Sequence, residues 1–307
     1  MSLHHSPEIM AYQRQNLDEC WGPSAMHVTE AQSIAGPLRE VVVAVLDTGI
    51  DAVGPLLGEC LYQRVSVVDS GESADSLGHG THVAGTIAAI APNSRIVDIR
   101  VADSRGSCTS TDVAKGILKA IAAGADVINL SLEVEGSPEL QAAIECAWQR
   151  GAVLVAAAGM PLPEPGCVRN SQSEEALLTQ PNLPLLSSPV CPASYPQVIA
   201  VTGTNENDEL APLCNRGDWV DLAAPGLRTY SDLPGGTRGY LTGTSTATSH
   251  VSGVAALLLG IVRDENGDGR VNDEVRNALE MTARPIDIEG TGSGIVDAVA
   301  AVTFMQS

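Results

Sequence analysis

The chain carries very little positive charge. Its 307 residues include only two lysines, Lys115 and Lys119, beside fifteen arginines, and the formal net charge is −20 at pH 7. A protein that binds nucleic acid needs a basic face for the phosphates, so this class of function is disfavoured. The acidic surface aids solubility and would attract cationic peptides, or it reflects a salty habitat or a compositional bias of the genome.

Long apolar runs are also missing. A membrane-spanning helix needs about 20 consecutive apolar residues, and the nearest candidate, residues 241–261, contains Thr, Ser and His throughout. The first residues, Met-Ser-Leu-His-His-Ser, lack the charged and apolar pattern of a signal peptide. We therefore expect no membrane span.

The seven cysteines are an odd number for a disulfide framework. Cys146 lies in a helical pattern and is expected in the core. Cys167 and Cys191 bracket an irregular stretch and are candidates for a disulfide.

Apolar runs and helical patterns alternate along the chain. Runs typical of strands cover residues 41–46, 95–101, 126–130, 152–157 and 197–201, and patterns typical of helices cover residues 79–90, 111–123, 138–150, 245–261 and 272–283. Strands that are apolar at nearly every position are those buried on both faces. The sequence predicts an α/β fold with a doubly wound, mostly parallel sheet flanked by helices.

Three segments place reactive residue types at the boundaries of these elements. Asp47 ends an apolar run (Val-Ala-Val-Leu-Asp-Thr-Gly), His79 begins a helix (Gly-His-Gly-Thr-His-Val-Ala-Gly-Thr), and Ser245 begins another (Gly-Thr-Ser-Thr-Ala-Thr-Ser-His). A serine hydroxyl is a poor nucleophile alone, because it needs a base, and the base needs an orienting carboxylate. The three residues are therefore candidates for a catalytic triad.

These segments resemble the signature blocks of the subtilisin-like serine proteases (subtilases), whose triad has the chain order Asp, His, Ser. The resemblance covers residues 20–302 and implies one peptidase domain there, with residues 1–19 as an extension, residues 160–196 as a proline-rich insertion and residues 303–307 as a tail. It implies that Ser245 is the nucleophile, His79 the base and Asp47 its orienter. No long segment precedes Asp47 of the kind that serves many subtilases as a folding propeptide, so it was removed or never present.

The resemblance fails at the residue that stabilises the oxyanion. Subtilases usually carry Asn after Ala-Ala-Gly, whereas this chain has Met160, which has no donor. Losing that donor costs roughly 10²–10³ in kcat in subtilisin itself. The Ser245 amide remains as a donor, and Asn170, Gln172, Asn215 or the hydroxyl of Thr246 are candidates to replace the missing one.

The resemblance also implies where a substrate binds. Ser131, Leu132 and Glu133 on one side, Gly106 and Ser107 on the other, and Gly159 beside the nucleophile would hold an extended peptide as an added strand. Subtilases commonly have glycine at the position of Glu133. Its carboxylate either favours a basic residue near the cleaved bond or points to solvent.

A further segment resembles the first part of an EF-hand or dockerin calcium loop. Oxygen ligands fall at positions 1, 3 and 5, glycine at 6 and a backbone carbonyl at 7, but position 12 is Val275 and the acid lies one residue early. The candidate ligands are Asp264, Asn266, Asp268, Arg270 (through its carbonyl) and Glu274. The alternative is an acidic turn between helices.

The expected function is that of a serine endopeptidase with an altered oxyanion hole, acting on an extended peptide or protein substrate. A peptide ligase or cyclase derived from a subtilase, or an inactive peptide-binding protein, are the alternatives. We expect a monomer with a structural calcium ion. A secreted mature domain is favoured over a cytoplasmic protein.

Overall fold

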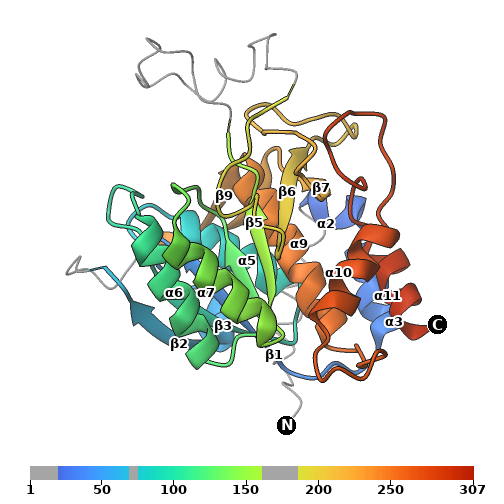
Figure 1. Ribbon diagram of the computed structural model, residues 1–307, viewed down its shortest axis with the longest axis horizontal. Coiled ribbons are helices and arrows are strands. Elements are labelled where there is room, and N and C mark those ends of the chain that lie inside the picture. Colours follow the sequence, from blue (N-terminus) through green and yellow to red (C-terminus); the bar gives the residue numbers. More distant parts are fainter. Residues whose placement is uncertain (1–19, 69–74, 161–185) are drawn as a thin grey trace.

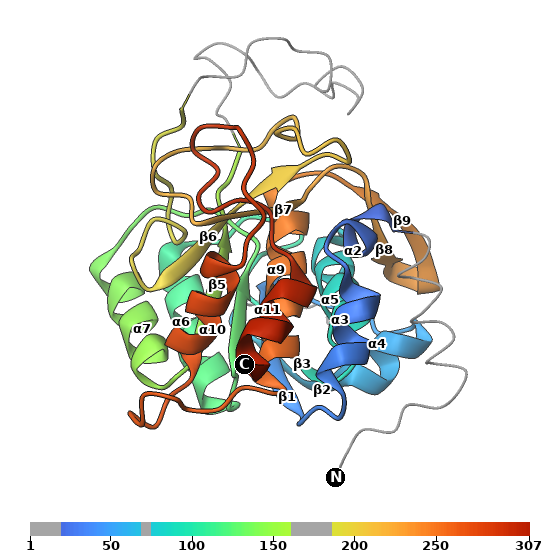
Figure 2. The same cartoon turned by 90° about the vertical axis from the view of Figure 1, so that its right-hand side faces the viewer.

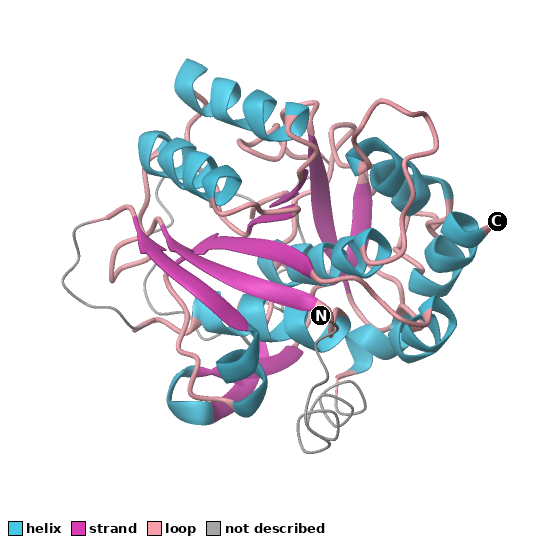
Figure 3. Cartoon of the chain, turned by 90° about the horizontal axis from the view of Figure 1, so that it is seen from below, coloured by secondary structure: helices cyan, strands magenta, loops and turns pink. Residues whose placement is uncertain are grey.

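A seven-stranded parallel sheet runs through the protein (Figures 1 and 3). The computed structural model describes residues 20–68, 75–160 and 186–307. The strand order is β2-β3-β1-β4-β5-β6-β7, and every pairing in this sheet is parallel. The strands are β1 (Val41–Asp47), β2 (Leu61–Ser66), β3 (Ser94–Arg100), β4 (Val127–Leu130), β5 (Val153–Ala157), β6 (Val198–Thr204) and β7 (Leu222–Pro225), and β8 (Thr229–Leu233) with β9 (Thr237–Leu241) forms a separate antiparallel hairpin.

Helices cover both faces of the sheet. One face packs against α6 and α7, and the other packs against α3, α5, α9, α10 and α11. Figure 2 shows α11 beside α3, so the two ends of the described chain meet on the second face. The helices are α2 (Trp21–Ala25), α3 (Val28–Ala35), α4 (Pro55–Cys60), α5 (His79–Ile90), α6 (Ser110–Ala122), α7 (Pro138–Gln149), α9 (Thr244–Leu259), α10 (Asn272–Met281) and α11 (Ala298–Gln306).

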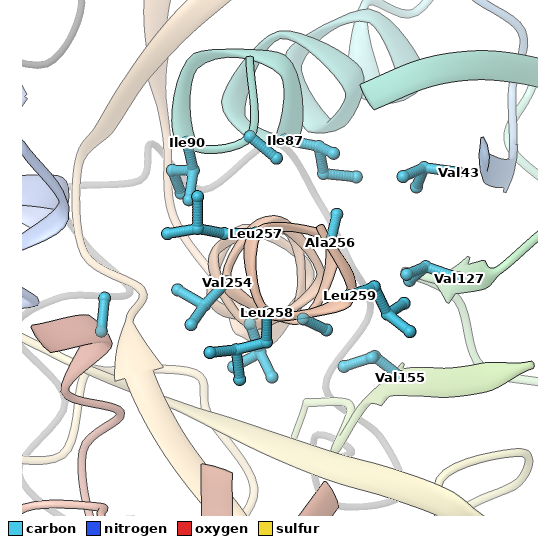
Figure 4. Packing of buried hydrophobic residues seen from close by; sticks show 14 of the residues in the cluster. Val43, Ile87, Ile90, Val127, Val155, Val254, Ala256, Leu257, Leu258 and Leu259 are labelled. Atoms are coloured by element: carbon cyan, nitrogen blue, oxygen red, sulfur yellow. The ribbon is translucent and has the colours of Figure 1, made fainter. Parts of the chain in front are cut away.

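Helix α9 forms the centre of the larger core. Figure 4 shows Leu257 facing Ile87 and Ile90 of α5, and Leu259 facing Val127 and Val155 of the sheet. Every residue of α9 except Ser245 is buried. Full burial of one such leucine side chain stabilises the fold by about 2 kcal/mol. The helix is thereby fixed in place, with its second residue left accessible.

Local sequence signals explain where the outer helices begin. Thr109 accepts the N–H of Asp112, whose carboxylate accepts the Thr109 N–H in return, which makes a capping box at the start of α6. Ser137 caps α7, and Pro138 takes its first position, where no hydrogen bond is lost.

The predicted fold class is confirmed, because five predicted strands correspond to β1, β3, β4, β5 and β6 of one parallel sheet. Helix α11 continues to Gln306 and so includes most of the segment expected as a tail, while the domain bounds stay a prediction. Most of the proline-rich insertion lies outside the described residues. No helix in the described part of the chain is both long and apolar enough to cross a membrane.

Candidate active site

Two of the three predicted triad residues form a hydrogen-bonded pair at the carboxyl edge of the sheet. Asp47 is the last residue of β1, and His79 is the first residue of α5. His79 Nδ1 lies 2.7 Å from Asp47 Oδ1, which also accepts the N–H of Thr48 at 2.7 Å. The Asp47 side chain is 3% exposed and the His79 side chain 33% exposed. A buried carboxylate thus orients an imidazole whose other edge reaches solvent.

A glycine allows the start of α5 to approach β1 this closely. A Cβ at Gly80 would lie 2.2 Å from the carbonyl oxygen of Gly49 and 3.1 Å from the Cβ of Asp47. No side chain fits into that space, so the Gly-His-Gly order is required for the Asp47–His79 contact.

The electrostatics of the pair suit a general base. Burial lowers the pKa of His79, but the charge of Asp47, the hydrogen bond with it and the charge of Asp75 together raise that pKa above its usual value. Two other buried histidines behave differently. Burial lowers the pKa of His82 to about 4 and that of His250 to about 4, so both are neutral supports within the core.

Ser245 is the second residue of α9 and faces the segment after β4. Its hydroxyl donates to the Ser131 carbonyl oxygen at 3.3 Å. Among the described residues, no hydrogen bond joins Ser245 to His79. Such bonds are often long or misaligned until substrate binds.

A chain of buried hydrogen bonds holds the backbone of Ser245, the candidate nucleophile, and the sequence did not reveal it. The Ser131 hydroxyl donates to the Ser245 carbonyl oxygen at 3.0 Å and accepts from Asn129 Nδ2 at 3.0 Å. The side-chain oxygen of Asn129, Oδ1, in turn accepts the hydroxyl of Ser252, further along α9, at 2.9 Å. Polar residues inside apolar segments, as in Val-Ile-Asn-Leu, were the one signal of it.

The turn after β5 brings Gly159, the residue before Met160, against Thr244 at the start of α9. Gly159 has φ +78°, a conformation that favours glycine, and its N–H donates to the Thr244 hydroxyl at 3.1 Å. Met160 is 40% exposed, and its thioether supplies no donor. The Ser245 N–H, in the first turn of α9, is a backbone donor that needs no intrahelical partner.

The structure places two of the proposed replacement donors. The Asn215 amide is buried and donates to the Ala158 carbonyl oxygen at 2.8 Å. The Thr246 hydroxyl is buried and contacts the carbonyl oxygens of Gly243 at 2.9 Å and Gly226 at 3.3 Å. The single hydrogen of the Thr246 hydroxyl is therefore engaged. Asn215 Nδ2 has a second N–H and lies 3.2 Å from where a Cβ on Gly159 would be, so Asn215 stays a candidate donor. Asn170 and Gln172 lie outside the described residues.

The expected substrate-binding residues divide into two groups. Ser131, Leu132 and Glu133 follow β4 and lie beside the turn formed by Gly159 and Met160. The Glu133 carboxylate is close to this turn, because a Cβ placed on Gly159 would lie 2.6 Å from Glu133 Oε2. The segment stays extended as far as Val134, whose N–H donates to the Cys191 carbonyl oxygen at 3.0 Å.

Gly106 and Ser107, expected on the opposite strand, belong to a turn instead. The Ser107 carbonyl oxygen accepts the Asp103 N–H at 2.9 Å, and the Ser107 N–H donates to the Asp103 carboxylate at 2.9 Å. The aspartate draws the backbone into this turn, which uses the polar groups that a substrate strand would need from Ser107. Gly106, at φ +79°, lies against Leu77.

The acidic loop between α9 and α10 binds its own backbone. Both carboxylate oxygens of Asp264 accept backbone N–H groups of the loop, as do the side-chain oxygen of Asn266 and one oxygen of Glu274. Asp268 pairs with the Arg270 guanidinium. Within the described ranges no three His, Cys, Asp or Glu side chains are grouped to hold a metal ion. The five predicted ligands do not converge, and calcium binding stays a prediction.

The disulfide prediction involves one described cysteine. Cys191 is a free thiol in this structure, 3.6 Å from the Ser194 hydroxyl. Its predicted partner, Cys167, lies outside the described residues.

Comparison with known proteins agrees with the geometry. The model of the subtilase family (peptidase S8) matches residues 39–300. The chain is 36% identical over 300 residues to a thermophilic serine proteinase of Bacillus sp. (strain AK1), covering 92% of this chain and 67% of that protein. It is 37% identical over 298 residues to thermitase of Thermoactinomyces vulgaris, covering 92% and 96%, and 36% identical over 272 residues to a subtilisin of Bacillus pumilus, covering 85% and 90%. The chain belongs to the subtilase family.

Proposed function

We propose that this protein is a serine endopeptidase that cleaves extended peptide segments through an acyl-enzyme. The observation that carries the proposal is the 2.7 Å contact of His79 Nδ1 with the buried Asp47, at the sheet edge where Ser245 begins α9. The similarity to proteins named thermitase, subtilisin and serine proteinase supports it.

The residues suggest the following reaction. Ser245 Oγ attacks the carbonyl carbon of the peptide bond while its proton passes to His79 Nε2. Asp47 stabilises the imidazolium through Nδ1. The tetrahedral intermediate collapses, the C–N bond breaks, and the same proton leaves with the amine. Water then attacks the ester in a mirror of the first step, which releases the acid and restores the Ser245 hydroxyl.

The oxyanion is held less well than in a relative with an amide at the Met160 position. The Ser245 N–H is the remaining backbone donor, and one lost donor is worth about 3–4 kcal/mol. We therefore propose slow turnover. Slow loss of the acyl group to water also leaves time for a second amine to resolve it, so the same site supports a ligase or cyclase as a second candidate.

The substrate is proposed to bind as an extended strand beside Ser131–Val134, because this segment follows β4 in extended form next to the nucleophile. A structural calcium ion at the 264–274 loop belongs to the same proposal. It rests on the spacing of the oxygen-bearing side chains alone.

Covalent labelling tests the proposal. A fluorophosphonate should add to Ser245 in the parent and fail to add to Ser245→Ala, because only an activated serine reacts. Ser137→Ala removes a hydroxyl at the start of α7 and should label like the parent. Retained labelling in Ser245→Ala would exclude this nucleophile, and no labelling of the parent would favour an inactive binding protein. Product masses separate the two reactions, since hydrolysis adds a water and transfer does not.

A further inference from the structure

Asp75 is a buried carboxylate that lies behind the catalytic pair without belonging to it. It is 2% exposed. Oδ1 accepts the hydroxyl of Thr48 at 2.8 Å and the N–H groups of Leu77 and Gly78 at 3.1 and 2.9 Å. Oδ2 accepts the N–H and the hydroxyl of Thr81 at 2.9 and 2.7 Å. Five donors therefore converge on one carboxylate, whose oxygens act only as acceptors.

This carboxylate replaces the missing cap of α5. The N-cap residue is Gly78, with φ +82° and no side chain to satisfy the first N–H groups of the helix. Asp75 accepts two of these N–H groups, from Gly78 and Thr81, and places a negative charge at the positive end of the helix. Because His79 is the first residue of α5, Asp75 fixes the backbone from which the imidazole projects.

Thr48 joins the same carboxylate to the other half of the pair. Its hydroxyl donates to Asp75 and accepts the Gly80 N–H at 3.1 Å, while its own N–H donates to Asp47 Oδ1. That oxygen is the one in contact with His79 Nδ1. Asp75 is thus linked through Thr48 to Asp47 and through the start of α5 to His79.

The charge of Asp75 also acts on the base. Burial lowers the pKa of His79, and Asp47 raises it through its charge and its hydrogen bond. The negative charge of Asp75 raises the pKa of His79 further. The other ionisable side chains buried near this end of α5 are His82 on the helix itself and Asp98 and Arg100 on β3.

We propose that Asp75 is a positioning residue for the general base: through Thr48 and the start of α5 it holds His79 in contact with Asp47, and its negative charge favours the protonated form of the base. It touches neither the substrate nor the reacting atoms. The inference rests on the proposed peptidase activity.

The test is the pH profile of Asp75→Asn. The amide keeps the shape of the side chain but removes the charge and places an NH₂ group against a donor. We expect kcat to fall roughly 10- to 100-fold with KM nearly unchanged, since small misplacements of a catalytic group have effects of this size. The acid limb of kcat/KM should move to lower pH, because a negative charge that favours the imidazolium is gone.

Asp126→Asn is the matched control. This acid accepts the Val42 N–H at 2.8 Å at the opposite end of the sheet, so its loss should lower the melting temperature without moving the acid limb. The acid limb of Asp75→Asn could instead stay in place while kcat falls only in proportion to the fraction of enzyme that is folded. This result would show that Asp75 has a structural role alone. If Asp75→Asn does not fold, Thr48→Val removes the hydroxyl that joins Asp75 to Gly80, and an unchanged kcat in that variant overturns the part of the proposal that runs through Thr48. A parent without hydrolytic activity would instead defeat the proposed function.

Discussion

The hydroxyl of Ser245 donates to the carbonyl oxygen of Ser131 at 3.3 Å, and the hydroxyl of Ser131 donates to the carbonyl oxygen of Ser245 at 3.0 Å. This reciprocal contact ties the proposed nucleophile to the segment along which the substrate is proposed to lie. The orientation of the first turn of α9 therefore depends on a side chain from the segment that follows β4.

Ser131→Ala should lower both stability and turnover. It leaves the buried Asn129 amide without an acceptor for one N–H, which costs about 1–3 kcal/mol. It also releases the first turn of α9, so we expect kcat to fall by about tenfold with little change in KM. Steady-state kinetics and urea unfolding measure the two effects.

Ser137→Ala is the control for that variant, because the same atom is lost from the cap of α7 at a cost of about 1 kcal/mol. Ser137→Ala should lower the free energy of unfolding without changing kcat. Equal kcat in both variants would show that the Ser131 hydroxyl does not position the nucleophile.

Buried His82 should make the fold sensitive to acid. Burial lowers its folded-state pKa to about 4, whereas an unfolded histidine has a pKa of about 6.5. Between these values the unfolded state binds more protons, so stability falls as the pH drops through this window, by up to about 3 kcal/mol for this one group.

Urea unfolding of the inactive Ser245→Ala variant at pH 4.5 and 7 measures this loss without self-digestion. His82→Gln keeps an N–H that can donate to the Thr229 carbonyl oxygen but does not titrate. It should reduce the difference in unfolding free energy between the two pH values. A difference equal to that of the parent background would assign the acid sensitivity to other groups.

Glu133 should favour a basic residue just before the cleaved bond, because its carboxylate lies against Gly159 beside the nucleophile. An exposed ion pair contributes up to about 1 kcal/mol, which is roughly fivefold in kcat/KM. Glu133→Gln should lose this preference for Arg over Leu, whereas Glu145→Gln on α7 should retain it. No difference between matched Arg and Leu peptides in the parent would mean that the Glu133 carboxylate does not select this substrate residue.

Calcium, if the 264–274 loop binds it, should raise the melting temperature in proportion to occupancy. A free calcium concentration of 100 times Kd raises the free energy of unfolding by about 2.7 kcal/mol. Chelation should reverse the effect, and Asp264→Ala with Asp268→Ala should abolish it. Chelator sensitivity that persists in the double variant would place any ion elsewhere, and a parent indifferent to calcium would leave the loop as a self-bonded turn.

The sequence could indicate the triad because each member sits in a short local pattern at the end of a strand or the start of a helix. The Ser131–Ser245 contact joins residues 114 positions apart, and neither flanking pattern specifies it. Asp75 was missed for another reason: it caps α5 from outside the usual N-cap position. The edge strand β2 was missed because its sequence, Leu-Tyr-Gln-Arg-Val-Ser, is half exposed and lacks the apolar run of a central strand.

Met160 should limit the rate of the proposed reaction. The Thr246 hydroxyl is bonded to backbone oxygens, and Asn215 gives one of its two amide N–H groups to the Ala158 carbonyl oxygen. Of these two residues, only the second N–H of Asn215 is left to replace the donor that the thioether lacks. Met160→Asn should raise kcat about tenfold or more with little change in KM, because the new hydrogen bond forms mainly in the transition state. Met281→Asn, at the exposed end of α10, is a matched substitution that should change neither value.

The products of Met160→Asn decide what the methionine does. No gain in kcat would mean that another group already occupies the donor position, with Asn170 and Gln172 of the proline-rich insertion the first to substitute. A higher kcat for hydrolysis with no other change in products would show that the oxyanion hole of the parent lacks a donor. A shift from ligation to hydrolysis, followed by product mass with a competing amine present, would show more. Because water and the amine attack the same ester, such a shift would mean that Met160 controls which nucleophile resolves the acyl-enzyme, and not merely how fast it forms.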